Sequence, residues 1–288
     1  MVSMTEAQQL SPPLAEHGEG PVWFAETEQL RIVDMLAGDI VTIDADGALV
    51  ERRSVGTVAA AFRPRVGGGL VIAVERGFAL LSPEGELTTL PEVWSDPTVR
   101  MNDGACDTQG RFLCGSMAYD ASPGRGSLHR LELEGTTTTV LSGVTISNGL
   151  SFSADGASAI YVDSMTHQVR RYRMPADDGP WLDYDVLVEI DPSVGTPDGL
   201  CLDAEGGVWV ALWNGSAVHR YAADGELTDV VTLPVPQVTA CTLGGPDGRT
   251  LFITTSALGV DRDAQPAAGA VFTSRVAVPG EPVLAARV

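Results

Sequence analysis

Four oxygen-bearing side chains recur at one position of a repeated pattern in this chain of 288 residues. Glu19, Asn102, Asn148 and Asp198 each stand just ahead of a small apolar segment, which turns through Asp, Gly or a similar breaker and returns as an apolar strand. If the repeats form a ring, these side chains meet near its axis. Carboxylate and amide oxygens are hard ligands, suited to Ca²⁺, Mg²⁺ or Mn²⁺. The pattern therefore predicts a site for one divalent cation.

The repeat that positions these residues has six copies, which begin near residues 20, 61, 105, 151, 201 and 242. A spacing of about 40 to 50 residues is typical of a β-propeller blade. Each copy also holds a further short strand and turn, and the Asp-Gly pairs at 46–47 and 224–225 are hairpin signals because Gly adopts positive φ. We expect an all-β fold, a six-bladed β-propeller with four antiparallel strands per blade, and one domain over residues 1–288.

The ends of the chain add two expectations. The N-terminal segment is a candidate for the strand that completes the last blade, beside residues 269–288. The first 13 residues have neither a basic region nor an apolar stretch, so no secretory signal is expected and the cytoplasm is the expected location. No window is apolar over the roughly 18 residues that a membrane helix needs, and we expect no membrane partner.

Composition excludes several classes of function. A formal net charge of -20 argues against binding nucleic acid, whose phosphates require a basic face. All 18 cationic side chains are Arg, so Schiff-base chemistry, a pyridoxal phosphate anchor and a P-loop lysine are impossible. A Gly-x-Ser-x-Gly nucleophile elbow is absent as well, which argues against a serine hydrolase.

The four cysteines are expected to be structural. No pair has Cys-x-x-Cys spacing, and Cys106, Cys201 and Cys241 occupy nearly the same position of three repeats. Free cysteine usually behaves as a small buried hydrophobe, so we expect these three on the first strands of their blades.

Each polar motif taken alone is an ordinary turn, because Asn-Gly and Asp-Gly are common turn dipeptides. The copies differ, however, and the second and sixth carry Ala60 and Ala240 at this position. If these residues served only to form turns, every blade would carry a similar turn residue at this position. The asymmetry therefore favours a site.

Further side chains are expected on the same face of the ring. Strand direction alternates within a blade, so Arg100 and Asp120 share the face of the four oxygen donors. Tyr119, Trp213 and His17 are additional candidates there. The alternative for Trp213 is packing between blades.

The motifs resemble those of the SMP-30/gluconolactonase/regucalcin family over nearly the full chain. The resemblance rests on the order of Gly-Glu-Gly-Pro-Val-Trp at 18–23, Arg-Met-Asn-Asp-Gly at 100–104, Ile-Ser-Asn-Gly-Leu at 146–150, Thr-Pro-Asp-Gly-Leu at 196–200 and Gly-Gly-Pro-Asp-Gly-Arg-Thr-Leu at 244–251. It implies a six-bladed propeller with one catalytic divalent metal ion on its axis.

The resemblance also implies roles for single residues. Glu19, Asn148 and Asp198 match the metal ligands of the family. In the expected mechanism, Asp198 accepts the proton of the attacking water. Arg100 and Asn102 match its substrate-contacting pair. Asp120 falls where relatives such as regucalcin carry a Glu that binds substrate hydroxyls.

The expected function is hydrolysis of a sugar lactone or related small lactone, in which the cation polarises the carbonyl and water attacks. The shorter acid at Asp120 and the phenol of Tyr119 indicate a reshaped pocket, so the particular lactone stays open. The metal stays open among Ca²⁺, Mg²⁺, Mn²⁺, Zn²⁺ and Fe²⁺, as does the oligomeric state. Three alternatives remain: a phosphotriesterase-like hydrolase, another tailoring enzyme on the same scaffold, and a ligand-binding propeller without activity.

Overall fold

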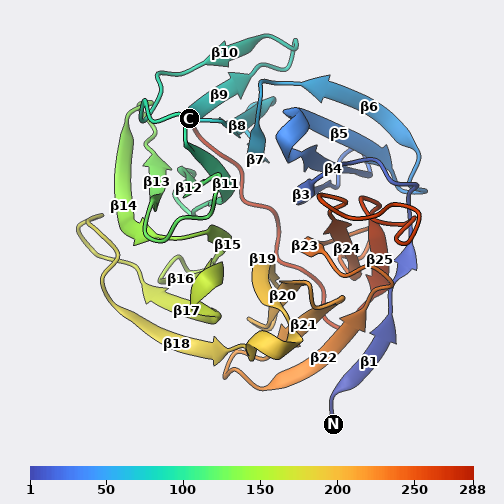
Figure 1. Cartoon of the computed structure of the whole chain (residues 1–288). Coiled ribbons are helices and arrows are strands. Elements are labelled where there is room, and N and C mark those ends of the chain that lie inside the picture. Colours follow the sequence, from blue (N-terminus) through green and yellow to red (C-terminus); the bar gives the residue numbers. More distant parts are fainter.

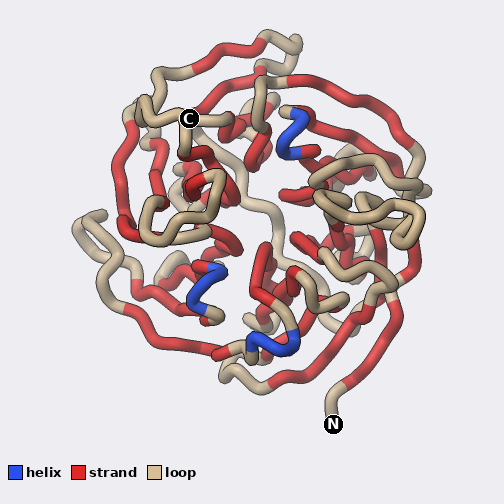
Figure 2. The backbone as a smooth tube through the Cα atoms, viewed as in Figure 1, coloured by secondary structure: helices blue, strands red, loops and turns tan.

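Six β-sheets surround a central axis like the blades of a propeller (Figure 1). The structure is a computed structural model that describes residues 1–288. Strands dominate it, and the helices are three short 3-10 turns, η1 (Met35–Ala37), η2 (Ser164–Thr166) and η3 (Pro192–Val194), as Figure 2 shows. The expected all-β, six-bladed fold is confirmed.

Each blade is a sheet of antiparallel strands that runs from the axis to the rim. The innermost strands of blades 1 to 6 are β3 (Gly18–Phe24), β7 (Ala59–Pro64), β11 (Val99–Cys106), β15 (Ser147–Phe152), β19 (Thr196–Leu202) and β23 (Val238–Gly244). The second strands are β4 (Gln29–Asp34), β8 (Leu70–Val74), β12 (Phe112–Ala118), β16 (Ser158–Asp163), β20 (Val208–Trp213) and β24 (Thr250–Thr255).

The third strands are β5 (Asp39–Asp44), β9 (Gly77–Leu81), β13 (Gly126–Leu131), β17 (Gln168–Arg173), β21 (Ala217–Tyr221) and β25 (Phe272–Arg275). The outer strands of the first five blades are β6 (Leu49–Ser54), β10 (Leu87–Thr89), β14 (Thr137–Val144), β18 (Tyr184–Glu189) and β22 (Leu227–Thr232).

The N-terminal segment closes the ring. Strand β2 (Gln8–Gln9) pairs antiparallel with β25 and completes blade 6. Strand β1 (Ser3–Glu6) pairs parallel with β22 and adds a fifth strand to blade 5. One short segment therefore holds the last two blades together at their outer edges.

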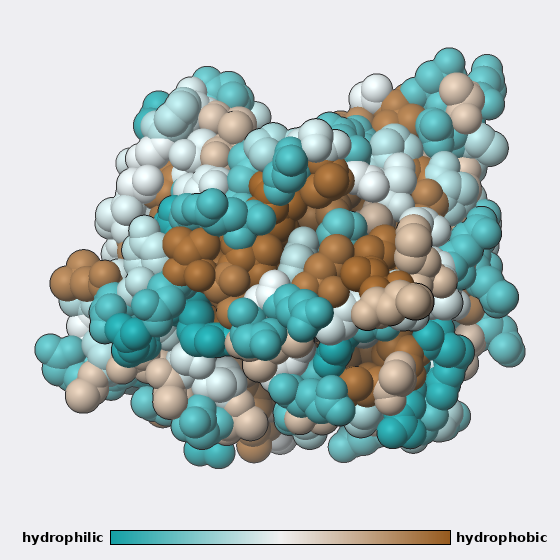
Figure 3. Space-filling view, turned by 90° about the horizontal axis from the view of Figure 1, so that it is seen from below, coloured by the Kyte–Doolittle hydropathy of each residue, from teal (hydrophilic) through white to brown (hydrophobic).

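Burial falls from the axis to the rim. Strands β3 and β23 are buried almost throughout, whereas β6 and β10 are largely exposed. Seen from the edge of the disc in Figure 3, apolar patches lie among polar side chains on this outer surface. The core lies between adjacent blades, where the apolar faces of neighbouring sheets pack together.

All six innermost strands carry an irregularity at the same place. Pairing with the second strand shifts by one residue between Glu19 and Val22, and likewise within 59–61, 101–104, 148–150, 197–200 and 238–240. Such a bulge adds one residue to a strand and re-aims its side chains. The repeated polar positions of the sequence therefore coincide with the bulges.

The first strands begin two to six residues earlier than expected, at 18, 59, 99, 147, 196 and 238. The sequence places Glu19, Asn148 and Asp198 ahead of these strands because polar residues beside Gly have the composition of turns. In the structure they belong to the strands. Backbone pairing continues past them because the bulge accommodates the extra residue.

A tail of residues 276–288 crosses the centre of the ring (Figure 1). Ala204 N donates to Pro279 O at 2.9 Å, and Ala286 N donates to Pro64 O at 2.8 Å. These contacts lie at the turns between first and second strands, opposite the face where the innermost strands begin. The tail therefore covers the axial channel from that side, above a cavity of about 310 Å³.

Candidate metal centre

The oxygen donors predicted from the sequence are all buried on the innermost strands. Relative exposure is 3% for Glu19, 4% for Asn102, 5% for Asn148 and 6% for Asp198. They belong to blades 1, 3, 4 and 5, so only the ring brings them together. In blades 2 and 6 the same position holds Ala60 and Ala240, which are also buried.

Direct hydrogen bonds join blades 3 and 4 at the axis. Asn102 Nδ2 donates to Asn148 Oδ1 at 3.0 Å and to the Ser147 carbonyl at 2.9 Å. Asn148 Nδ2 donates to Ser164 Oγ at 2.9 Å. Because the Asn148 nitrogen faces Ser164, its oxygen is held toward the axis and keeps a second lone pair for another partner.

Arg100 reaches across the ring from blade 3. Its Nη1 donates to Asn102 Oδ1 at 2.7 Å, to the Met101 carbonyl at 2.9 Å and to Met35 Sδ at 3.1 Å. No carboxylate lies within ion-pair distance of Arg100, and its Nε is buried without a hydrogen bond. Desolvation by burial lowers the pKa of this guanidinium. Arg100 therefore keeps donor capacity at the mouth of the site.

The two carboxyl groups of the site, Glu19 and Asp198, are buried and have raised pKa values. Desolvation by burial raises the pKa of Glu19, and the charge of Asp103 raises it further. Desolvation and then the charges of Glu19 and Asp103 hold the pKa of Asp198 well above its ordinary value. Asp198 Oδ1 is buried and accepts no hydrogen bond. Burying a carboxylate without a compensating charge costs free energy, so a bound cation would stabilise this arrangement.

These residues fit a divalent metal ion. No group of three or more His, Cys, Asp or Glu side chains is arranged to hold a metal ion, and the candidate donors at the axis are two buried carboxyl groups and one buried amide. The unpartnered Asp198 Oδ1, the Glu19 carboxylate and the free lone pair of Asn148 Oδ1 are the oxygens that would hold the ion. Oxygen-only donors suit hard cations such as Ca²⁺, Mg²⁺ or Mn²⁺.

Tyr119 and Asp120 lie in the loop that follows β12 and differ in what they contact. The Tyr119 hydroxyl donates to Glu75 Oε1 at 2.7 Å, and its ring lies 5.7 Å from the Arg100 guanidinium. Asp120 is exposed and accepts a hydrogen bond from Ser122 N at 3.0 Å within its own loop. The structure thus brings Tyr119 beside Arg100, whereas the Asp120 carboxylate contacts neither Arg100 nor Asn102.

His17 and Trp213 pack against each other. Their rings meet edge to face at 5.9 Å, and His17 Nδ1 lies 2.8 Å from Ser256 Oγ. Desolvation by burial and then the charge of Arg100 lower the pKa of His17 to about 4. His17 is therefore a neutral side chain at neutral pH, next to the half-buried Trp213.

Sequence reasoning missed three contributors. Asp103 adds negative charge beside Glu19 and Asp198, and its position next to Asn102 in the Asn-Asp-Gly motif was an available signal. Ser164 orients Asn148, and Glu75 holds Tyr119. No local pattern marks Ser164 or Glu75, because each acts through a contact with a residue far along the chain that only the fold brings near.

The fold and the site together define the class of protein: a β-propeller with buried oxygen donors near its axis. Residues 17–257 match the family model described as the SMP-30/Gluconolactonase/LRE-like region. The chain belongs to this family. No helix is both long and apolar enough to span a bilayer.

Curated relatives match along most of the chain. Regucalcin from Xenopus laevis is 34% identical over 266 residues, covering 88% of this chain and 89% of the relative. A pentonolactonase from Haloferax volcanii is 33% identical over 272 residues, covering 92% of each chain. A 6-deoxy-6-sulfogluconolactonase from Pseudomonas putida is 34% identical over 279 residues, covering 93% of this chain and 94% of the relative.

Solved structures agree over the whole length. A calcium-binding protein, regucalcin from Agrobacterium tumefaciens, superposes with a TM-score of 0.91 at 26% identity and covers 100% of both chains. A luciferin-regenerating enzyme superposes with a TM-score of 0.89 at 27% identity, covering 98% of this chain and 99% of its own. The backbone of this chain is thus shared with relatives of different names.

Proposed function

We propose that this protein is a metal-dependent hydrolase that opens the ring of a small lactone. Relatives named for lactone hydrolysis match more than nine tenths of the chain at 33% and 34% identity. The name of one solved relative includes calcium binding, which supports a divalent cation as the cofactor. Glu19, Asn148 and Asp198 are the proposed ligands.

The buried Asp198 Oδ1 without a hydrogen bond is the observation that carries this proposal. Burial and then the charges of Glu19 and Asp103 raise the pKa of Asp198, while burial and then the charge of Asp103 raise the pKa of Glu19. A stability role alone would favour an apolar or fully hydrogen-bonded residue here. When bound, a divalent cation supplies Lewis acidity that polarises the lactone carbonyl.

Asp198 is the proposed general base. Its carboxylate accepts one proton from the attacking water while the water oxygen bonds to the carbonyl carbon. The bond between that carbon and the ring oxygen then breaks. The leaving alkoxide takes the proton back from Asp198, and the product is a hydroxy acid. The carboxylate is thereby regenerated for the next turnover.

Arg100 and Asn102 are proposed to orient the substrate. Nη1 of Arg100 is fixed by Asn102 Oδ1, which leaves the buried Nε and the rest of the fork as donors for substrate oxygens. Tyr119 on one side and the pair of His17 and Trp213 on the other are the proposed walls of the pocket. These walls, rather than the axis, select the particular lactone.

The test is hydrolysis by matched variants. Asp198→Asn keeps the shape of the side chain and removes the base and one ligand charge, so acid release from a panel of aldonolactones is expected to fall at least about 100-fold. Asp155→Asn is the control, since Asp155 is an exposed carboxylate that accepts from Ala157 N in a distant turn. Equal rates for wild type and Asp198→Asn would refute the proposal. Turnover of a phosphotriester but of no lactone would replace it by the phosphotriesterase alternative.

A further inference from the structure

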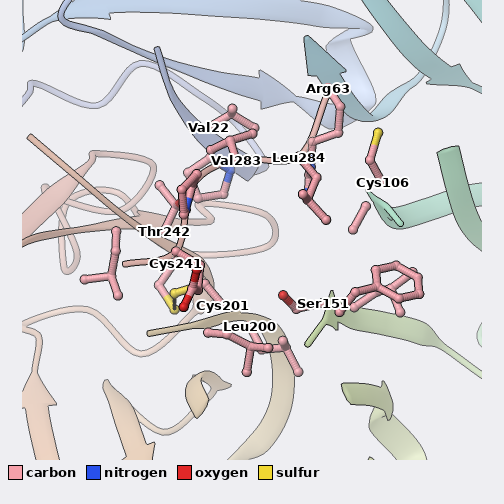
Figure 4. A pocket seen from close by; sticks show the side chains of 18 of the residues that line it. Val22, Arg63, Cys106, Ser151, Leu200, Cys201, Cys241, Thr242, Val283 and Leu284 are labelled. Carbon is pink, nitrogen blue, oxygen red and sulfur yellow. Dashed lines mark hydrogen bonds between the residues drawn. The ribbon is translucent and has the colours of Figure 1, made fainter. Parts of the chain in front are cut away.

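Two cysteines from neighbouring blades touch inside the axial cavity. Cys201 lies on β19 of blade 5 and Cys241 on β23 of blade 6, and their sulfurs are 3.8 Å apart. Figure 4 shows the two sulfurs side by side, with Cys106 on the far side of the same cavity. All the cysteines are free thiols. The proposed hydrolysis makes no use of this pair.

A glycine explains why the two strands approach so closely. A Cβ placed on Gly199 would lie 2.5 Å from the Ala240 Cβ and 2.8 Å from its Cα. The backbones of β19 and β23 are therefore in direct contact at this point. Cys201 follows two residues later and Cys241 one residue later. Because neither neighbour can move apart without opening the ring, the sulfurs are held in contact.

The pair is also reachable from the cavity. Cys201 is partly exposed and Cys241 is buried, and both line the cavity of about 310 Å³ beneath the tail. That volume admits a small oxidant such as a peroxide. Cys201 is therefore the thiol that meets the oxidant first, with Cys241 in place to resolve the product.

We propose that Cys201 and Cys241 are a redox-sensitive pair that peroxide converts into a disulfide linking blades 5 and 6. The sulfur of Cys201 attacks one peroxide oxygen, which breaks the O–O bond and gives a sulfenic acid and one water. The sulfur of Cys241 then attacks the sulfenic sulfur and releases a second water. Two thiols and one hydrogen peroxide thus give one disulfide and two waters, the sulfurs being oxidised and the peroxide reduced.

Forming the bond requires the two sulfurs to close from 3.8 Å. A disulfide has sulfurs about 2.05 Å apart, so the two side chains must rotate toward each other while their strands stay in contact. The hydrogen bond with Cys241 and then burial hold the pKa of Cys201 well above its ordinary value. Because the thiolate is the reactive form, oxidation is slow and follows sustained exposure to peroxide.

The cross-link would reinforce the contact between blades 5 and 6. The N-terminal segment already joins these two blades at their outer edges, through β1 in blade 5 and β2 in blade 6. The disulfide would join the same blades at their inner edges and close a loop of 40 residues. Closing such a loop reduces the freedom of the unfolded chain and stabilises the native protein.

The experiment oxidises the intact protein with excess hydrogen peroxide, alkylates remaining thiols under denaturing conditions and maps peptides by mass spectrometry. We expect one cross-linked peptide pair containing Cys201 and Cys241, reversed by a thiol reductant. The melting midpoint of the oxidised protein should rise by about 5 °C. Cys201→Ser and Cys241→Ser should abolish the cross-link and the shift. Cys106→Ser is the control, because Cys106 lines the same cavity without touching either sulfur, and it should retain both.

Three results would overturn the proposal. One is complete alkylation of Cys201 and Cys241 after prolonged oxidation, which needs no variant and so does not depend on whether the serine variants fold. Another is conversion of Cys201 to sulfinic or sulfonic acid without a cross-link. The third is a cross-link and a shift that persist in Cys201→Ser. The proposal does not rest on lactone hydrolysis, so either can fail without the other.

Discussion

The side-chain amide of Asn102 donates a hydrogen bond to Oδ1 of Asn148 at 3.0 Å, and this bond joins blades 3 and 4 at the axis. The donor leaves one lone pair of Asn148 Oδ1 for a metal ion. Asn102 thereby positions a ligand oxygen while its own oxygen accepts from Arg100 at 2.7 Å. One residue connects the proposed ligand set with the proposed substrate contact.

Removing this connection should weaken metal binding. Asn102→Ala frees the Asn148 amide to rotate, and loss of such a supporting hydrogen bond typically lowers metal affinity about 10- to 100-fold. Calorimetric titration of stripped protein with Ca²⁺ and Mn²⁺ measures the change. Ser164→Ala, which removes the partner of Asn148 Nδ2, should act in the same direction. Unchanged affinity in both variants would contradict the positioning role.

Stability of the metal-stripped protein should depend on pH in an unusual direction. Glu19 and Asp198 have raised pKa values when folded, so above their unfolded values, 4.5 and 3.8, the native state holds more protons than the unfolded state. Stability contributed by the protonated carboxyls is then present at low pH and lost as pH rises. A bound cation removes this dependence because it favours the charged forms.

The measurement is chemical unfolding of loaded and stripped protein between pH 5 and pH 8. We expect the stability difference between the two forms to grow with pH by at least about 1 kcal/mol, the equivalent of roughly one pKa unit. Comparing the two forms cancels the titration of groups away from the site. A difference that is constant over this range would show that Glu19 and Asp198 do not hold the ion.

His129 gives the opposite pH dependence. It stacks on Trp94 with ring centroids 5.0 Å apart, and burial lowers its pKa from 6.5 to about 4. Below pH 6.5 this histidine binds a proton in the unfolded state but not in the native state. The free energy of unfolding therefore falls as the pH drops toward 4. Over this pH interval, the free energy of unfolding of His129→Gln should fall by about 2 kcal/mol less than that of the wild type. Parallel acid-denaturation curves for the two proteins would count against this reading.

The N-terminal strands should be required for a stable ring. Besides the strand pairing of β1 and β2, this segment forms a bond from Ala7 N to Thr232 O at 2.9 Å. Deleting residues 2–9 is expected to lower the free energy of unfolding by at least about 3 kcal/mol, at about 1 kcal/mol per lost hydrogen bond. Gln8→Ala is the control, because the Gln8 side chain is exposed. Equal stability of the deleted and intact chains would show that the ring closes without this segment.

Much of the fold was predictable because each blade repeats a local pattern of strands and Asp-Gly turns. The closing strand was less so, since Gln8 and Gln9 form only two residues of strand and have no apolar alternation. The pairing of β1 with blade 5 was not foreseen, because it depends on a long-range contact with β22.

The site was predictable in part for a similar reason. Glu19, Asn148 and Asp198 stood out because Ala60 and Ala240 break the pattern at the same position. Their place inside bulged strands was not evident, because polar residues beside Gly have the composition of turns. The contact of Cys201 with Cys241 was also hidden, since it depends on how closely β19 approaches β23.

The most direct test of the central claim is the rate of acid release from an aldonolactone by protein stripped of metal and then reloaded. The account predicts negligible turnover by the stripped protein and full recovery when Ca²⁺, Mg²⁺ or Mn²⁺ is restored, with no recovery in Asp198→Asn. Undiminished hydrolysis by the stripped wild type would contradict it.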